Sequence, residues 1–210
     1  MIAALDVDLV AVQEVDRELD RSGRRDQVGE LARRLGWHSV FVPSLLGDPR
    51  LRPSAPWPRP ASRQRNAPHP LQRSPPEQPD AVRRAARVAG GGDVGPAAPR
   101  VALLATTGDV RVTATHLSTL PWRSARQLRC VLGLGCGGQN VVLGDLNLPL
   151  ALVTAVADGW TAAVAGPTFP ACRPWMQLDH VLVRGGGIAS VRLGPGPSDH
   201  HAVRATVTVR

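Results

Sequence analysis

The sequence predicts an α/β fold in which helices alternate with strands, several of them close enough to pair antiparallel. Residues 8–13 form a short apolar run typical of a buried strand, and residues 26–35 place apolar side chains on one face of a helix. Near the C-terminus, residues 202–209 alternate Val or Ala with Arg or Thr, as a strand with one buried and one solvated face does.

The other elements follow from the residues that begin or end them. Gly36 ends the first helix, Pro121 opens the second because proline suits a first helical turn, and Gly159 ends the third. Residues 107–109 form the turn of a predicted hairpin. Further strands are expected over 39–42, 100–105, 110–115, 140–144, 178–183 and 188–193, and further helices over 121–134 and 150–157.

We expect one domain over residues 1–210, interrupted by a segment of different composition. Residues 49–100 hold 12 of the 20 prolines and ten arginines against three acidic residues, a local charge of +7 in a chain of +8. We therefore expect 49–99 to be irregular or disordered, since it offers little apolar surface to bury. All 25 basic residues of the chain are Arg, a bias typical of a GC-rich genome, so arginine content alone does not indicate nucleic-acid binding.

Two classes of protein are disfavoured by the composition. No run of 18 apolar residues occurs, so we expect no transmembrane segment. The three cysteines show no C-x-x-C spacing, which argues against a disulfide framework or a cysteine zinc site. No signal peptide is visible, and we expect a cytoplasmic monomer.

Polar residues capable of chemistry recur where apolar strands end. Each has an ordinary alternative when taken alone: Glu14 can open a solvated loop, and the Asp and Asn residues are common turn formers. Their repetition at strand ends favours a site, because the edge of a sheet is a rigid place to present functional groups. The candidates are Glu14, His116, Asp145, Asn147, Asp179, Asp199 and His200.

The residue types suit metal-assisted hydrolysis of a phosphoester. Carboxylates such as Glu14 and Asp199 are hard oxygen ligands for Mg²⁺ or Mn²⁺. A histidine held by an aspartate can deprotonate water, and Asn or His can donate hydrogen bonds to a phosphoryl oxygen. The expected partner is a phosphoester substrate, with nucleic acid among the candidates.

Five motifs in order resemble the endonuclease/exonuclease/phosphatase superfamily. Its strand ending in Gln-Glu matches residues 8–15, its Thr-His-Leu matches 115–117, and its Gly-Asp-(Leu/Phe)-Asn matches 144–147. The fourth motif, Thr-Phe followed by Asp-(Tyr/His), matches Thr168-Phe169 and Asp179-His180. The fifth, a terminal Ser-Asp-His, matches residues 198–200.

The resemblance implies both the fold and the metal site. The family fold is a four-layered sandwich, with two mixed β-sheets face to face and helices outside. By the resemblance, Glu14 is the metal-binding glutamate and Asp199 a further metal-site aspartate, with Mg²⁺ or Mn²⁺ as the cofactor.

The resemblance also implies catalytic and phosphate-binding roles. It makes His200 the general base, Asp179 the aspartate that orients it, and Asp145 the aspartate that orients the attacking water. His116 contacts the phosphate and Asn147 binds it. The activity implied is that of a Mg²⁺-dependent phosphodiesterase, nuclease or phosphatase.

Two departures from the family pattern leave an alternative open. The family's opening strand, with its asparagine, has no counterpart before Met1, so we expect a sandwich incomplete at its N-terminal strand. Residues 49–99 stand where the family has a strand pair; a shifted reading frame is one hypothesis, which an intact frame in the resequenced gene would refute. The alternative is therefore a catalytically impaired, truncated relative, or an Arg-rich nucleic-acid-binding protein without catalysis.

Overall fold

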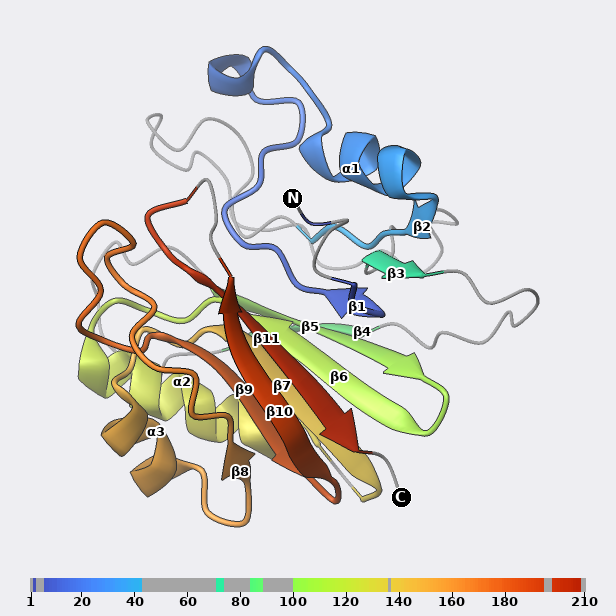
Figure 1. The fold of residues 1–210 in the computed structure, drawn as a ribbon. Coiled ribbons are helices and arrows are strands. Elements are labelled where there is room, and N and C mark those ends of the chain that lie inside the picture. The colour runs from blue at the N-terminus through green and yellow to red at the C-terminus, as the bar shows by residue number, and fades with distance from the viewer. Residues whose placement is uncertain are drawn as a thin grey trace.

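The computed structural model describes Ile2, residues 6–42, 100–135, 137–194 and 198–208, and the backbone of residues 71–73 and 84–88. Figure 1 shows a large β-sheet, helices α2 and α3 on one side of it, and further strands and helix α1 on the other. No helix in these ranges is long and apolar enough to cross a bilayer.

The large sheet has six strands in the order β4-β5-β6-β7-β9-β8. β6 and β7 run parallel and the other neighbours antiparallel, so the sheet is mixed. The strands are β4 (Arg84–Val88), β5 (Arg100–Thr107), β6 (Val110–Thr115), β7 (Gln139–Asp145), β8 (Thr161–Ala162) and β9 (Asp179–Arg184).

This sheet is buried on both faces because its central strands are apolar at successive positions. On one face, Val142 and Leu182 pack with Leu128 of α2 (Pro121–Gly133) and Val153 of α3 (Leu150–Val156). All four are at most 1% exposed, and burial of each such side chain contributes about 1.5–3 kcal/mol. Helices α2 and α3 therefore cover this face of the sheet.

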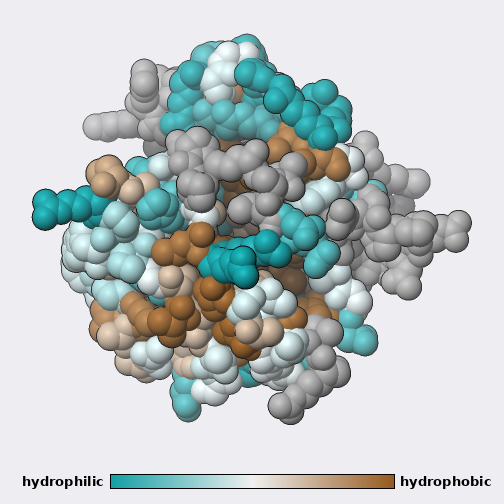
Figure 2. Space-filling model, in the orientation of Figure 1, coloured by the Kyte–Doolittle hydropathy of each residue, from teal (hydrophilic) through white to brown (hydrophobic). Residues whose placement is uncertain are grey.

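The opposite face is covered by a second β-layer. Val141 and Val181 pack there with Val191 and Val203, which belong to the antiparallel pair β10 (Gly187–Gly194) and β11 (Ala202–Thr208). Figure 2 shows brown, apolar residues gathered where β9, β10 and β11 lie in Figure 1, whereas the region of α1 is largely hydrophilic. The two β-layers thus share an apolar core.

A third, small antiparallel sheet has the order β1-β3-β2, and Leu9 of this sheet packs against the apolar cluster between the two β-layers. Helix α1 packs beside β2, and the short 3-10 helix η2 precedes α1. The layers give the α/β sandwich expected from the sequence, with helices outside two β-layers. Among the described strands, none joins β11 to β1. The bounds are β1 (Leu9–Val10), β2 (Trp37–His38), β3 (Leu71–Arg73), η2 (Asp20–Ser22) and α1 (Gln27–Leu35).

Most predicted elements are confirmed within two residues, because their caps and turns were readable. Asp26 caps α1 by accepting a hydrogen bond from the Gly29 amide, and Gly36 ends it with a left-handed φ of 65°. Gly108, at φ 54°, makes the predicted hairpin turn between β5 and β6.

Three expectations need correction. The strand predicted over 8–13 forms only at Leu9–Val10, the two residues that pair with β3. The strand predicted over 39–42 is instead β2 at Trp37–His38, because the partner strand β3 reaches only those two residues. Within the segment 49–99, expected to be irregular, β3 and β4 form regular strands. Pairing of β4 with β5 satisfies backbone hydrogen bonds that local composition does not reveal. The other residues of 43–99 lie outside the described part of the chain.

Candidate active site

Asp145 and Asp179 lie opposite each other at one edge of the large sheet. They form the last paired position of the antiparallel strands β7 and β9. Gly144 precedes Asp145 with a φ of 136°, a conformation that side chains rarely adopt. The strand ends therefore present two carboxyl groups side by side.

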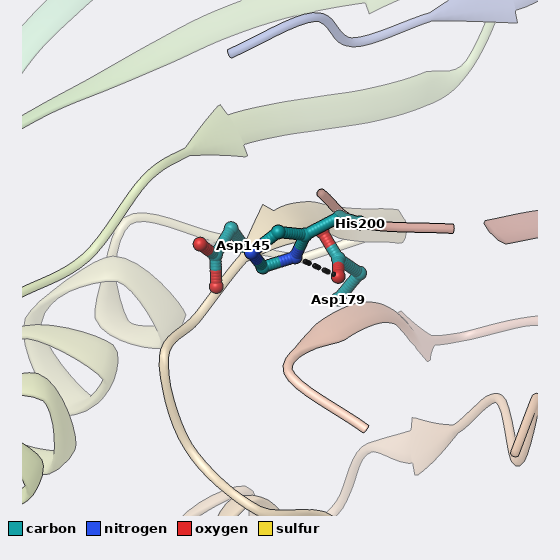
Figure 3. A group of neighbouring side chains, drawn as sticks. All are labelled: Asp145, Asp179 and His200. Carbon is teal, nitrogen blue, oxygen red and sulfur yellow. Dashed lines mark hydrogen bonds and ion pairs between the residues drawn. The ribbon is translucent and has the colours of Figure 1, made fainter. Parts of the chain in front are cut away.

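His200 reaches this edge from the segment that precedes β11. Its Nδ1 lies 2.7 Å from Oδ2 of Asp179. Figure 3 shows the imidazole between the two carboxyl groups, with its second ring nitrogen on the side of Asp145. A neutral ring that donates its Nδ1–H to Asp179 leaves Nε2 able to accept a proton.

Burial and charge act in opposite directions on His200. Partial burial lowers the pKa of the imidazole, but the hydrogen bond and negative charge of Asp179, with the charges of Asp145 and Asp199, outweigh it. The pKa of His200 is therefore raised above its ordinary value. A base of this kind binds a proton more tightly than free histidine does, as proton abstraction from water requires.

Asn147 fixes the orientation of the Asp145 carboxyl group. Its main-chain N–H donates to Oδ1 of Asp145 at 2.8 Å, and its side-chain Nδ2 donates to Oδ2 at 3.2 Å. Nδ2 also donates to the Leu117 carbonyl at 3.1 Å. Burial raises the pKa of Asp145 to about 6, and the charges of Asp179 and Glu14 add to the shift.

His116 connects Asp145 to Glu14. Its Nε2 is 3.4 Å from Oδ2 of Asp145, and its Nδ1 is 3.9 Å from Oε1 of Glu14. Burial lowers the pKa of His116, and the nearby charge of Arg100 lowers it further. The ring is therefore neutral at pH 7 and can donate one hydrogen bond.

Asp199 directly precedes His200 in the chain, and it is exposed. Its Oδ1 accepts a hydrogen bond from the Ser198 hydroxyl at 3.1 Å, and its carbonyl accepts one from the Ala171 amide at 2.6 Å. The structure thus brings all seven predicted residues to one sheet edge. Among the described residues no ion pair or hydrogen bond joins Asp199 to Glu14, and their shared role in metal binding stays a prediction.

Over residues 1–200 the sequence matches the Endonuclease/Exonuclease/phosphatase family. The chain belongs to this family. The resemblance carried by the five motifs is confirmed. No curated protein sequence matches the chain.

Three solved structures are similar to the family domain described above. A humanised D. rerio TDP2 with 14 mutations is 18% identical (TM-score 0.49), over 61% of this chain and 67% of that one. An endonuclease/exonuclease/phosphatase from Bacteroides vulgatus is 16% identical (0.49), over 61% and 65%. A Bacteroides thetaiotaomicron mannosyl-6-phosphatase is 15% identical (0.45), over 61% and 67%. The chain thus spans about two thirds of the length of these proteins.

The family implies a divalent metal, and the donor set at this edge fits one. Asp145, Asp179 and His200 offer ligand atoms within 4.8 Å of one another. All three already have protein partners, since His200 bonds Asp179 and Asn147 bonds Asp145. Glu14 has a 78% exposed side chain that faces the site through His116. Its carboxylate has hard oxygen atoms of the kind that divalent cations such as Mg²⁺ prefer.

Arg100 lies close to the site but belongs to none of the five motifs. β5 begins at Arg100 and pairs Ala102 with Thr115, so Arg100 lies beside the segment that follows His116. Burial lowers its pKa, whereas the charges of Asp145 and Glu14 raise it. The arginine bias of the chain hides it, and only the β5–β6 register marks it. Its cationic guanidinium suits a phosphate oxygen.

Replacing Asp145 with Asn is expected to stabilise the metal-free protein at pH 8. The folded pKa of about 6 exceeds the ordinary 3.8, so ionisation penalises the folded state as the pH rises between these values. Above pH 6 the full penalty applies, on the order of 1–3 kcal/mol, and below pH 3.8 it is absent. Urea unfolding in EDTA at pH 8 and pH 4 measures the free energy of unfolding of the wild type and of the Asp145→Asn variant. A wild type that is more stable than the variant at pH 8 would contradict this expectation.

Proposed function

We propose that this protein is a divalent-metal-dependent hydrolase of phosphoester bonds. One observation carries the proposal: Nδ1 of His200 is fixed by Asp179, while the opposite side of the ring faces Asp145. This arrangement supplies a base and a second carboxyl group on either side of the place where a water can bind. Membership of the endonuclease/exonuclease/phosphatase family supports phosphoester hydrolysis as the reaction class.

In the proposed reaction, a water between His200 and Asp145 attacks phosphorus. Nε2 of His200 takes its proton, and the imidazolium that forms is stabilised by Asp179 at 2.7 Å. The new P–O bond forms as the bond to the leaving oxygen breaks, and that oxygen takes a proton from solvent. Asp145, held by Asn147, orients the water.

The phosphoryl group would be bound by the residues around Asp145. Neutral His116 donates one hydrogen bond, and Arg100 supplies positive charge. A divalent metal held by Glu14, with Asp199 as a further candidate ligand, would neutralise charge on the phosphoryl oxygens. Donors aimed at developing charge are typically worth about 10²- to 10³-fold in rate each.

The test is a Mg²⁺ titration of the hydrolysis of a chromogenic phosphodiester. We expect activity that EDTA removes and Mg²⁺ or Mn²⁺ restores. Glu14→Gln should raise the metal concentration for half-maximal rate by about tenfold or more, because it removes one ligand charge.

Glu18→Gln is the matched control, since Glu18 is an exposed glutamate of the same segment and outside the site. Its metal dependence should equal that of the wild type. Hydrolysis that is indifferent to EDTA, or absent with every metal, would refute the proposal.

A further inference from the structure

Thr168 is buried beside the site, at 0% exposure, and none of the proposed chemistry uses it. It is a fully buried polar residue, so its hydrogen bonds are part of what determines the local structure. Its oxygen atoms contact the segments that carry Asp179 and His200, which lie 21 residues apart in the sequence.

The side chain of Thr168 fixes the start of β9. Its Oγ1 accepts hydrogen bonds from the amides of Leu178 and Asp179, at 3.0 and 3.3 Å. Asp179 is the residue whose carboxyl group receives Nδ1–H of His200. Loss of Oγ1 would leave two partly buried amides without this acceptor, at the point where the Asp179 side chain leaves the strand.

The main chain of Thr168 fixes the segment that carries His200, the hydrogen-bond partner of Asp179. Its carbonyl accepts a hydrogen bond from the His201 amide at 2.8 Å. The next residue, Phe169, packs its ring against the imidazole of His200, with ring centroids 4.7 Å apart. The segment is itself held, because the Thr168 amide donates to the Met176 carbonyl at 2.8 Å.

We propose that Thr168 is a positioning residue that sets the geometry of the Asp179–His200 pair from both sides. This inference rests on the proposed function, in which that pair activates water. Thr168 is fully buried, so it would act through Asp179 and His200 rather than by direct contact with substrate. A displacement of about 1 Å in such a pair can cost on the order of 10²-fold in rate.

Two substitutions separate the hydrogen bonds of Thr168 from its packing. Thr168→Val keeps the shape and removes the hydroxyl, whereas Thr168→Ser keeps the hydroxyl and removes the methyl group. We expect Thr168→Val to lower kcat by about 10- to 100-fold with KM unchanged. Thr168→Ser should keep kcat within about threefold of the wild type. A role in packing alone predicts the reverse order.

Amide hydrogen exchange provides a readout that does not require activity. In Thr168→Val, exchange at Leu178 and Asp179 should accelerate, because their acceptor is the hydroxyl. Exchange at His201 should change less, because its acceptor is the main-chain carbonyl. The Thr168→Ser variant should match the wild type at all three amides.

The outcomes distinguish this inference from the proposed function. If the wild type hydrolyses the phosphodiester but Thr168→Val matches Thr168→Ser in kcat, the positioning role is wrong and the hydrolase proposal stands. If no metal yields hydrolysis, the hydrolase proposal fails, and with it the catalytic role of the pair. Unchanged exchange at Leu178 and Asp179 in Thr168→Val would overturn the inference by itself.

Discussion

Replacing His200 with Ala is expected to reduce kcat by about 10³- to 10⁴-fold, because it removes the general base. The ring is the group whose Nδ1 is fixed at 2.7 Å from Asp179 and whose far side faces Asp145. Substrate binding should change little, since the phosphate contacts proposed for His116 and Arg100 remain. Steady-state kinetics with the chromogenic phosphodiester, at saturating Mg²⁺, measures kcat and KM separately.

A double-mutant cycle with Asp179→Asn sharpens this test. Asp179 acts through His200, so adding Asp179→Asn to His200→Ala should lower kcat little further. His201→Ala is the control: His201 is a histidine beside His200, and within the described part of the chain its hydrogen bond comes from the main-chain amide, which donates to Thr168. Full activity in His200→Ala, or additive losses in the cycle, would show that the two residues do not work as a pair.

The candidate site could be predicted because its side chains are next to readable strand ends. Asp145 follows a buried apolar run and Asp179 begins another, and antiparallel pairing of β7 and β9 then places them opposite each other. Sequence indicates that such residues share an edge, but not their distances. The order of contacts from Glu14 through His116 to Asp145 depends on tertiary packing that no local pattern encodes.

What sequence could not predict depends on long-range pairing. β4 lies in proline- and arginine-rich sequence, and its regularity comes from hydrogen bonds with β5. Arg100 is one of 25 arginines, and only its register beside β6 separates it from the others. The role of Thr168 is equally hidden, because its partners are main-chain groups up to 33 residues away.

Gly144→Ala is expected to destabilise the fold by about 3–5 kcal/mol, the sum of backbone strain and overpacking. An added Cβ would lie 2.0 Å from the Thr115 carbonyl oxygen and 3.1 Å from Nε2 of Gln13. The carbonyl is main chain at the end of a neighbouring parallel strand, so it cannot move as a flexible side chain would. The φ of 136° adds strain for any residue with a side chain. Urea unfolding measures the loss.

Gly133→Ala is the matched control, because no atom lies within 4 Å of its added Cβ. It ends helix α2, where Ala should be neutral or stabilising by up to about 1 kcal/mol. Equal stability of the Gly144→Ala and Gly133→Ala variants would contradict the close approach of β6 and β7. The close approach of β6 and β7 matters for catalysis as well. Asp145 follows Gly144 at the end of β7, and His116 follows Thr115 at the end of β6. A Gly144→Ala protein that still folds at low temperature should therefore lose activity too, since the two residues could no longer keep their 3.4 Å contact.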